Sequence, residues 1–128
     1  MSTILIVDDE PGLRQLYQTA LSRQGYKVVV ASNGNEGLMA MEMAQPDLVL
    51  LDVAMPEMDG VQFLEILRKT PEWSKIPVIV LTGFATREQW LSLDSIGMTS
   101  HLTKAEFSLR ELRARIAEEL AIPAPAAA

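Results

Sequence analysis

Short apolar runs alternate along the chain with segments whose apolar residues recur at helical spacing. Four of the five runs are continuous rather than alternating, which is typical of strands buried on both faces of a parallel sheet. The runs lie at residues 4–7, 28–31, 48–51, 78–81 and, more weakly, 100–103. The pattern therefore predicts five strand–helix repeats, which form an α/β domain with helices on both faces of a parallel sheet.

Local signals mark several helix boundaries. Residues 86–89 and 108–111 both match the capping box, which indicates two helix starts. A helix from about Gly60 should end at Thr70, because Pro71 follows. Gly25 is expected to stop the first helix. Two apolar stripes at helical spacing support these boundaries, namely Leu13, Leu16, Tyr17, Ala20 and Leu21 in the first helix, and Leu109, Leu112, Ile116 and Leu120 in the last.

Composition narrows the class of protein. The 128 residues suit one domain, expected over residues 1–121, with residues 122–128 as a flexible Ala/Pro tail. The net charge of −6 argues against a nucleic-acid surface. The absence of cysteine excludes thiol catalysis, zinc–thiolate sites and disulfides. No apolar run approaches the ~20 residues of a membrane helix, and no signal peptide is visible, so the expected location is the cytoplasm.

Polar residues follow four of the five predicted strands. Asp8 and Asp9 follow the first, Asp52 the third, Thr82 the fourth and Lys104 the fifth. The carboxyl ends of parallel strands lie on one edge of a sheet, which is where open α/β sheets bind ligands. A strand order of 2-1-3-4-5 would place these four ends on neighbouring strands.

Carboxylates that meet at one edge repel one another unless a positive group joins them. Lys104 supplies one charge, and oxygen ligands suit Mg²⁺, with Mn²⁺ as an alternative. Asp52, alone on a central strand, is the candidate nucleophile toward a phosphoryl group. Thr82 and Lys104 could bind phosphate oxygens. An acidic pair such as Asp8 and Asp9 is otherwise a common helix-start signal.

Four segments resemble the receiver domain of bacterial two-component response regulators. They are ILIVDDEP at residues 4–11, DLVLLDVAMPEMDG at 47–60, IPVIVLTG at 76–83 and LTK at 102–104. Each is weak alone, but the four in this order and spacing are highly specific. The resemblance spans residue 3 to about 120 and implies a flavodoxin-like, doubly wound sheet of five parallel strands in the order 2-1-3-4-5.

The resemblance also implies residue roles. Asp52 would accept a phosphoryl group from a sensor histidine kinase or a phosphotransfer protein. Asp9 would ligate Mg²⁺ directly, Asp8 through water, and Ala54 through its backbone carbonyl. Thr82 and Lys104 would hold the phosphate. The domain would catalyse its own phosphorylation and dephosphorylation without being a turnover enzyme.

Three positions depart from the usual receiver pattern. His101 replaces the aromatic switch residue that works with Thr82, which suggests a weaker or pH-sensitive switch, with a solvated edge histidine as the alternative. Ala105 replaces the proline that carries a cis peptide bond, so we expect a trans bond there or a somewhat displaced loop. Phe84 and Ala54 flank the path of attacking water in receivers, and we expect slow self-dephosphorylation.

Two tryptophans and three methionines have expected places on the surface or in the core. Trp90 adjoins Leu91 on the fourth helix, and two successive residues cannot both point inward. We therefore expect Trp90, with His101, to contribute to a partner face formed by the fourth helix, fifth strand and fifth helix. Trp73 should anchor a loop at the core edge. The methionines at 39, 41 and 43 are interpreted as packing and helix filler rather than as a binding surface.

The leading hypothesis is a phosphorylation-activated switch that signals to a downstream target protein, without direct DNA or membrane binding, as a monomer or a phosphorylation-dependent dimer. A degenerate receiver that binds partners without phosphorylation is the alternative. A haloacid-dehalogenase-like phosphatase is disfavoured because Ala54 stands where such enzymes carry a second acid. A flavin-binding flavodoxin relative is disfavoured because no Ser/Thr-rich loop follows the first strand.

Overall fold

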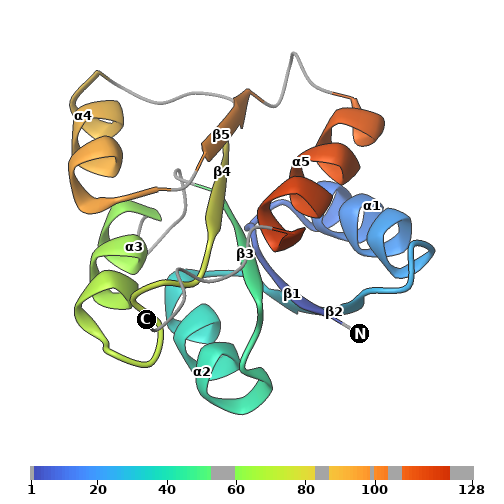
Figure 1. The fold of residues 1–128 in the computed structure, drawn as a ribbon, viewed down its shortest axis with the longest axis horizontal. Coiled ribbons are helices and arrows are strands. Elements are labelled where there is room, and N and C mark those ends of the chain that lie inside the picture. The colour runs from blue at the N-terminus through green and yellow to red at the C-terminus, as the bar shows by residue number, and fades with distance from the viewer. Residues whose placement is uncertain (1, 53–59, 83–86, 99, 104–107, 122–128) are drawn as a thin grey trace.

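The protein, seen in a computed structural model, is a five-stranded parallel sheet with helices on both faces (Figure 1). The structure describes residues 2–52, 60–82, 87–98, 100–103 and 108–121, with the backbone alone at Thr82 and Thr103. The strands are β1 (Thr3–Val7), β2 (Lys27–Ala31), β3 (Leu48–Asp52), β4 (Val78–Thr82) and β5 (Ser100–Thr103). The helices are α1 (Pro11–Ser22), α2 (Gly34–Ala44), α3 (Gly60–Lys69), α4 (Arg87–Ile96) and α5 (Leu109–Ala121).

The strand order is β2-β1-β3-β4-β5, and every neighbouring pair is parallel. This confirms the predicted flavodoxin-like topology, and each predicted strand is right to within one residue. Helices α1 and α5 cover one face of the sheet, and α2, α3 and α4 cover the other (Figure 1). The carboxyl ends of β1 and β3 therefore lie side by side at one edge of the sheet.

Alternation along the strands divides the core into two halves. On β1, Ile4 and Ile6 pack with α1 and α5, whereas Leu5 and Val7 pack with α2, α3 and α4. Because successive strand residues point to opposite faces, a continuous apolar run fills both halves at once. The uninterrupted runs in the sequence are thus the signature of a central, doubly covered sheet.

Local chemistry sets the helix ends much as the sequence predicts. At α5 the Glu111 amide donates to the Ser108 hydroxyl at 3.2 Å, which confirms the capping signal. Helix α3 ends at Lys69, one residue before Thr70. Gly25 follows α1 with a φ of +94°, in the left-handed region that favours glycine.

Helix α2 begins with a capping arrangement that the sequence analysis did not identify. The Glu36 amide donates to the Asn33 side chain at 2.8 Å. The Ser32 hydroxyl and amide donate to the Glu36 carboxylate at 2.6 and 2.8 Å. These bonds, the hydroxyl's above all, hold the pKa of Glu36 below its usual range. Side chains before the helix and within its first turn thus bond to each other's backbone and hold the start of α2.

Not every residue of the predicted apolar stripes is buried. Met41 lies in the core, but Met39 and Met43 are 64% and 83% exposed, so the packing role holds for Met41 and the other two occupy exposed positions of the helix. Leu16 is also exposed, because the buried stripe of α1 passes through Tyr17 and Leu21 instead. Trp73 packs at the edge of the core, as expected.

Candidate phosphoacceptor site

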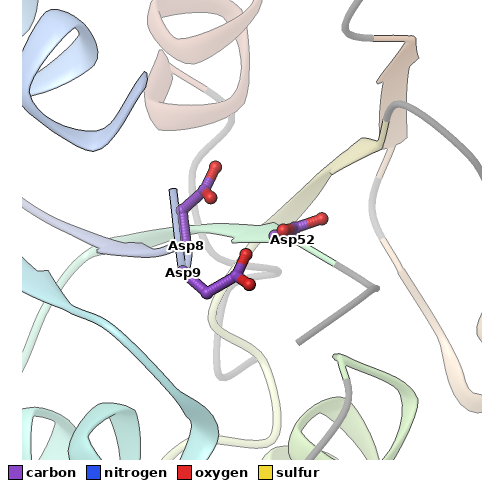
Figure 2. Close-up of side chains that lie close together, drawn as sticks. All are labelled: Asp8, Asp9 and Asp52. Atoms are coloured by element: carbon purple, nitrogen blue, oxygen red, sulfur yellow. The ribbon is translucent and has the colours of Figure 1, made fainter. Parts of the chain in front are cut away.

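Three carboxylates meet at the carboxyl edge of the sheet. Asp8 and Asp9 follow β1, and Asp52 is the last residue of the neighbouring strand β3 (Figure 2). One carboxylate oxygen from each residue lies within 4.8 Å of those of the other two. The strand register explains the grouping, because Val7 pairs with Leu51 and the next residue of each strand is an aspartate.

Asp8 combines a structural role with its place in the site. Its side chain accepts a hydrogen bond from the Glu10 amide at 2.9 Å, and its own amide donates to the Ala31 carbonyl at 3.1 Å. Arg14 donates to the Asp8 carbonyl at 2.8 Å. The Asp8 carboxylate thus orders the turn that leads into α1, although the N-cap of that helix is Glu10 and its first turn contains no acidic residue. The same bonds fix the direction in which the carboxylate points.

The electrostatics of this edge favour a bound cation. Asp8 is 1% exposed and Asp52 4% exposed, while Asp9 is half-buried. Two buried carboxylates beside a third repel one another strongly at low dielectric. Oxygens on one Mg²⁺ lie at most about 4.2 Å apart, twice the metal–oxygen distance, so small side-chain rotations or one bridging water would let this set share an ion. The donor set therefore fits a hard divalent cation.

The other predicted site residues are placed less completely. Thr82 ends β4, one residue beyond Leu81, which is the register partner of Asp52. The backbone of Thr82 thus reaches the same edge of the sheet. Lys104, Ala54, Phe84 and Ala105 lie outside the described residues.

Trp90 and His101 form a separate contact on the α4–β5 surface. Their ring centroids lie 4.6 Å apart with an interplanar angle of 59°. Leu91 is 60% exposed, whereas Trp90 is half-buried against the core, so Leu91 is the more exposed member of the adjoining pair. A hollow of about 500 Å³ opens beside them, and its lining residues are Arg87, Trp90, Leu91, Asp94, Met98 and His101.

Two arginines that matter to the arrangement were missed by sequence reasoning. Arg14 supports Asp8 from the first turn of α1, and the signal for it is its position, since long helical side chains lean toward the helix N-terminus. Arg68 is half-buried and donates to several backbone carbonyls, Gly97 and Ile76 at 2.9 Å among them. Burial lowers the pKa of Arg68 from its usual value. Nothing in the sequence near Arg68 distinguishes it from a surface arginine.

Comparisons with known proteins agree with this geometry. The chain is 41% identical over 113 residues to the probable transcriptional regulator ycf27 of Cyanophora paradoxa, covering 88% of this chain and 46% of that protein. It is 35% identical to the KDP operon transcriptional regulatory protein KdpE of Escherichia coli, covering 91% and 50%. The chain thus spans about half the length of these curated relatives.

Solved structures of receiver proteins are also similar to this chain. The chemotaxis protein CheY4 of Vibrio cholerae superimposes with a TM-score of 0.85 at 30% identity, covering 92% of this chain and 98% of that one. Within the described residues, no helix has the length and apolar character needed to cross a membrane. The family of the response regulator receiver domain matches residues 4–117, and the chain belongs to this family.

Proposed function

We propose that the chain is a phosphorylation-activated switch in which Asp52 accepts a phosphoryl group from a phosphohistidine. The observation that carries this is the grouping of Asp8, Asp9 and Asp52 within 4.8 Å at one sheet edge. Receiver domains of two-component systems are signalling switches rather than turnover enzymes. In the proposed step an Asp52 oxygen attacks phosphorus, the phosphorus–nitrogen bond breaks, and the imidazole leaves and takes a proton from solvent.

Receiver domains bind Mg²⁺ through an acidic pocket, and the three aspartates are the residues that would hold it here. We assign Asp9 and Asp52 as direct ligands, Asp8 as a ligand through water, and the Ala54 carbonyl as the remaining protein ligand. When bound, Mg²⁺ or Mn²⁺ would supply positive charge that offsets the phosphoryl oxygens. Thr82 and Lys104 would hold the same oxygens by a hydroxyl hydrogen bond and an ion pair.

The proposed output face joins α4, β5 and α5. Its support is the exposed Leu91 beside the Trp90–His101 contact and the hollow that these residues line. His101 would be the switch partner of Thr82, and in place of the usual aromatic residue it would make the switch weaker or pH-sensitive. Activation that is equal between pH 6 and 8, compared with a His101→Tyr variant, would contradict this role.

The proposed partners are a sensor histidine kinase or phosphotransfer protein upstream and a target protein downstream, in the cytoplasm. Curated relatives named as transcriptional regulators are about twice as long as this chain. For this chain we propose signalling by protein contact rather than by direct DNA binding.

Intact mass spectrometry after incubation with Mg²⁺ and acetyl phosphate tests the proposal. We expect one phosphoryl adduct on the wild type and none on Asp52→Asn. Asp47→Asn is the matched control, because Asp47 precedes the same strand at its other end, where it accepts a hydrogen bond from the Thr3 amide. It should be phosphorylated as the wild type is, and a chelator should abolish both adducts.

Other outcomes would select other functions. No adduct on any variant would favour the phosphorylation-independent binding module. Hydrolysis of many phosphomonoester molecules per chain would favour a phosphatase. Once the adduct is made, its decay tests the role proposed for Phe84 and Ala54, which is slow self-dephosphorylation. A lifetime of seconds without a phosphatase would contradict that role.

A further inference from the structure

Helix α2 carries two exposed methionines that the phosphoacceptor site does not use. Met39 and Met43 lie four residues apart, on one face of the helix, and are 64% and 83% exposed. Single exposed apolar residues are ordinary, but large adjoining ones mark interaction surfaces. Methionine suits such a surface, because its flexible thioether adapts to irregular partners.

Met39 lines a groove between α2, α3 and the segment before β4, and Met43 lies one turn further along the same helix. Two hollows of about 550 and 370 Å³ form it, and they share Glu42, Thr70 and Trp73. The larger is also lined by Met41, Gln45, Pro46, Glu72 and Ile76. The smaller is also lined by Leu38, Met39 and Ile66. We call these residues, together with Met43, the α2–α3 groove.

The groove lies far from the acidic site. Pro46 and Ile76 precede β3 and β4 by two residues, so the larger hollow is at the amino edge of the sheet. Asp52 is at the carboxyl end of β3, and a five-residue strand spans about 13 Å between its first and last residues. The groove is therefore a second surface, distinct from both the carboxylate cluster and the α4–β5 hollow.

The charge of the groove is one-sided. Glu42 and Glu72 line it, and among the described residues none that lines it is basic. Neither carboxylate has an ion-pair partner among the described residues, in contrast to Glu65, which pairs with Lys69 at 3.0 Å. The apolar wall of Trp73, Leu38 and the methionines therefore stands beside two carboxylates with which a partner's cations could pair.

We propose that the α2–α3 groove docks an amphipathic basic helix of another protein, with large apolar side chains on one face and Lys or Arg beside them. A helix laid in a groove buries its apolar face there, and its cations would pair with Glu42 and Glu72. A second copy of this chain fits the surface less well. The chain carries a net charge of −6, so two copies repel one another.

A synthetic peptide serves as the probe. It has sixteen residues, with leucines at positions i, i+3, i+4 and i+7 of one helical face and lysines between them. A peptide of the same composition in scrambled order is the control for charge alone. Titration into the ¹⁵N-labelled chain by NMR locates the contact and gives its Kd. We expect amide shifts in α2 and residues 70–76 with the patterned peptide, and much weaker ones with the scrambled peptide.

Surface variants decide which residues bind. The double variant Met39→Ser/Met43→Ser should weaken binding about tenfold, and Glu42→Gln/Glu72→Gln about threefold to tenfold with loss of salt dependence. Because these side chains are exposed, the urea midpoint should not change. Leu16→Ser, which replaces an exposed leucine on α1 at the opposite face of the sheet, should bind the peptide as the wild type does.

Several results would overturn the proposal. These are equal binding of both peptides, shifts confined to the α4–β5 hollow, unchanged affinity in the methionine or glutamate variants, or no shift at millimolar peptide. Concentration-dependent shifts in α2 without peptide, with a dimer in sedimentation, would assign the groove to a second copy and overturn it as well.

Discussion

Helices α3 and α4 are neighbours of equal length on the same face of the sheet, yet they are attached to it very differently. Each has ten residues. Helix α3 buries Phe63, Leu64 and Leu67 completely, whereas α4 buries only Leu93. Three buried side chains against one means that α3 belongs to the rigid core and that α4 is held by far less apolar area. A helix held weakly can rearrange at small cost in free energy.

Helix α4 is attached mainly toward its carboxyl end, since Trp90 in its first half is only half-buried against the core. Leu93 is in its second half, and Arg68 from α3 donates to the carbonyl of Gly97 just beyond it. The same guanidinium donates to the carbonyls of Trp73, Ser74 and Ile76. Arg68 thus joins the end of α4 to the segment before β4. A swing of α4 about this carboxyl end would have to break the contact of Trp90 with His101.

The largest expected effect comes from removing the anchor of α3. Phe63→Ala should lower the free energy of unfolding by about 3–5 kcal/mol, measured by urea denaturation. The ring is fully buried and also fills space left by Gly37, where an added Cβ would lie 2.7 Å from the Phe63 ring. Leu93→Ala is the comparison on α4. If Leu93→Ala costs more than Phe63→Ala, α3 is not the better anchored helix.

The second effect tests the link between the helices. Arg68→Met keeps the aliphatic stem and removes the donors to four carbonyls, so it should cost about 1–3 kcal/mol. Amide hydrogen exchange should accelerate most at residues 94–98. Lys69→Met is the matched control, because its ion pair with Glu65 is on the surface and contributes at most about 0.5 kcal/mol. Uniform acceleration throughout the sheet would mean that Arg68 stabilises the whole domain rather than α4.

The sequence predicted the parallel sheet and its aspartate cluster better than it predicted the unequal attachment of α3 and α4. Continuous apolar runs identify a doubly covered sheet, and the register of adjacent strands then brings Asp8 and Asp52 together without further information. Both steps depend on strand geometry, which has a period of two and a fixed direction. The predicted grouping of aspartates was confirmed for that reason.

The side of a helix that faces the core is harder to predict. Met39 and Met41 are two positions apart and read alike, yet one is exposed and the other buried, because the rotation of α2 depends on the close approach of Gly37 to Phe63. Arg68 is missed for a similar reason. Its partners are backbone carbonyls, of the segment before β4 and of Gly97, and a carbonyl carries no residue-specific signal.

A third, smaller effect concerns the contact between α4 and β5. A double-mutant cycle with Trp90→Leu and His101→Leu should give a coupling of about 0.5–1.5 kcal/mol for the ring pair, whose centroids are 4.6 Å apart. Coupling near zero would mean that the rings do not hold α4 against the sheet.

The smallest expected effect sharpens the comparison most directly, because one substitution is made on both helices. Leu91→Ser on α4 should change the free energy of unfolding by no more than about 0.5 kcal/mol, since the side chain is 60% exposed. Leu64→Ser on α3 removes a fully buried side chain and introduces a hydroxyl. It should lower the free energy of unfolding by several kcal/mol, as large-to-small substitutions in a core do. Urea denaturation of the two variants measures the difference. A leucine on α4 that does not contribute to stability can contribute to partner binding. Leu91→Ser should therefore weaken the binding of a partner to the α4–β5–α5 face while the domain stays folded. If Leu91→Ser instead destabilises the domain as much as Leu64→Ser does, α4 is part of the rigid core and the proposed swing is wrong.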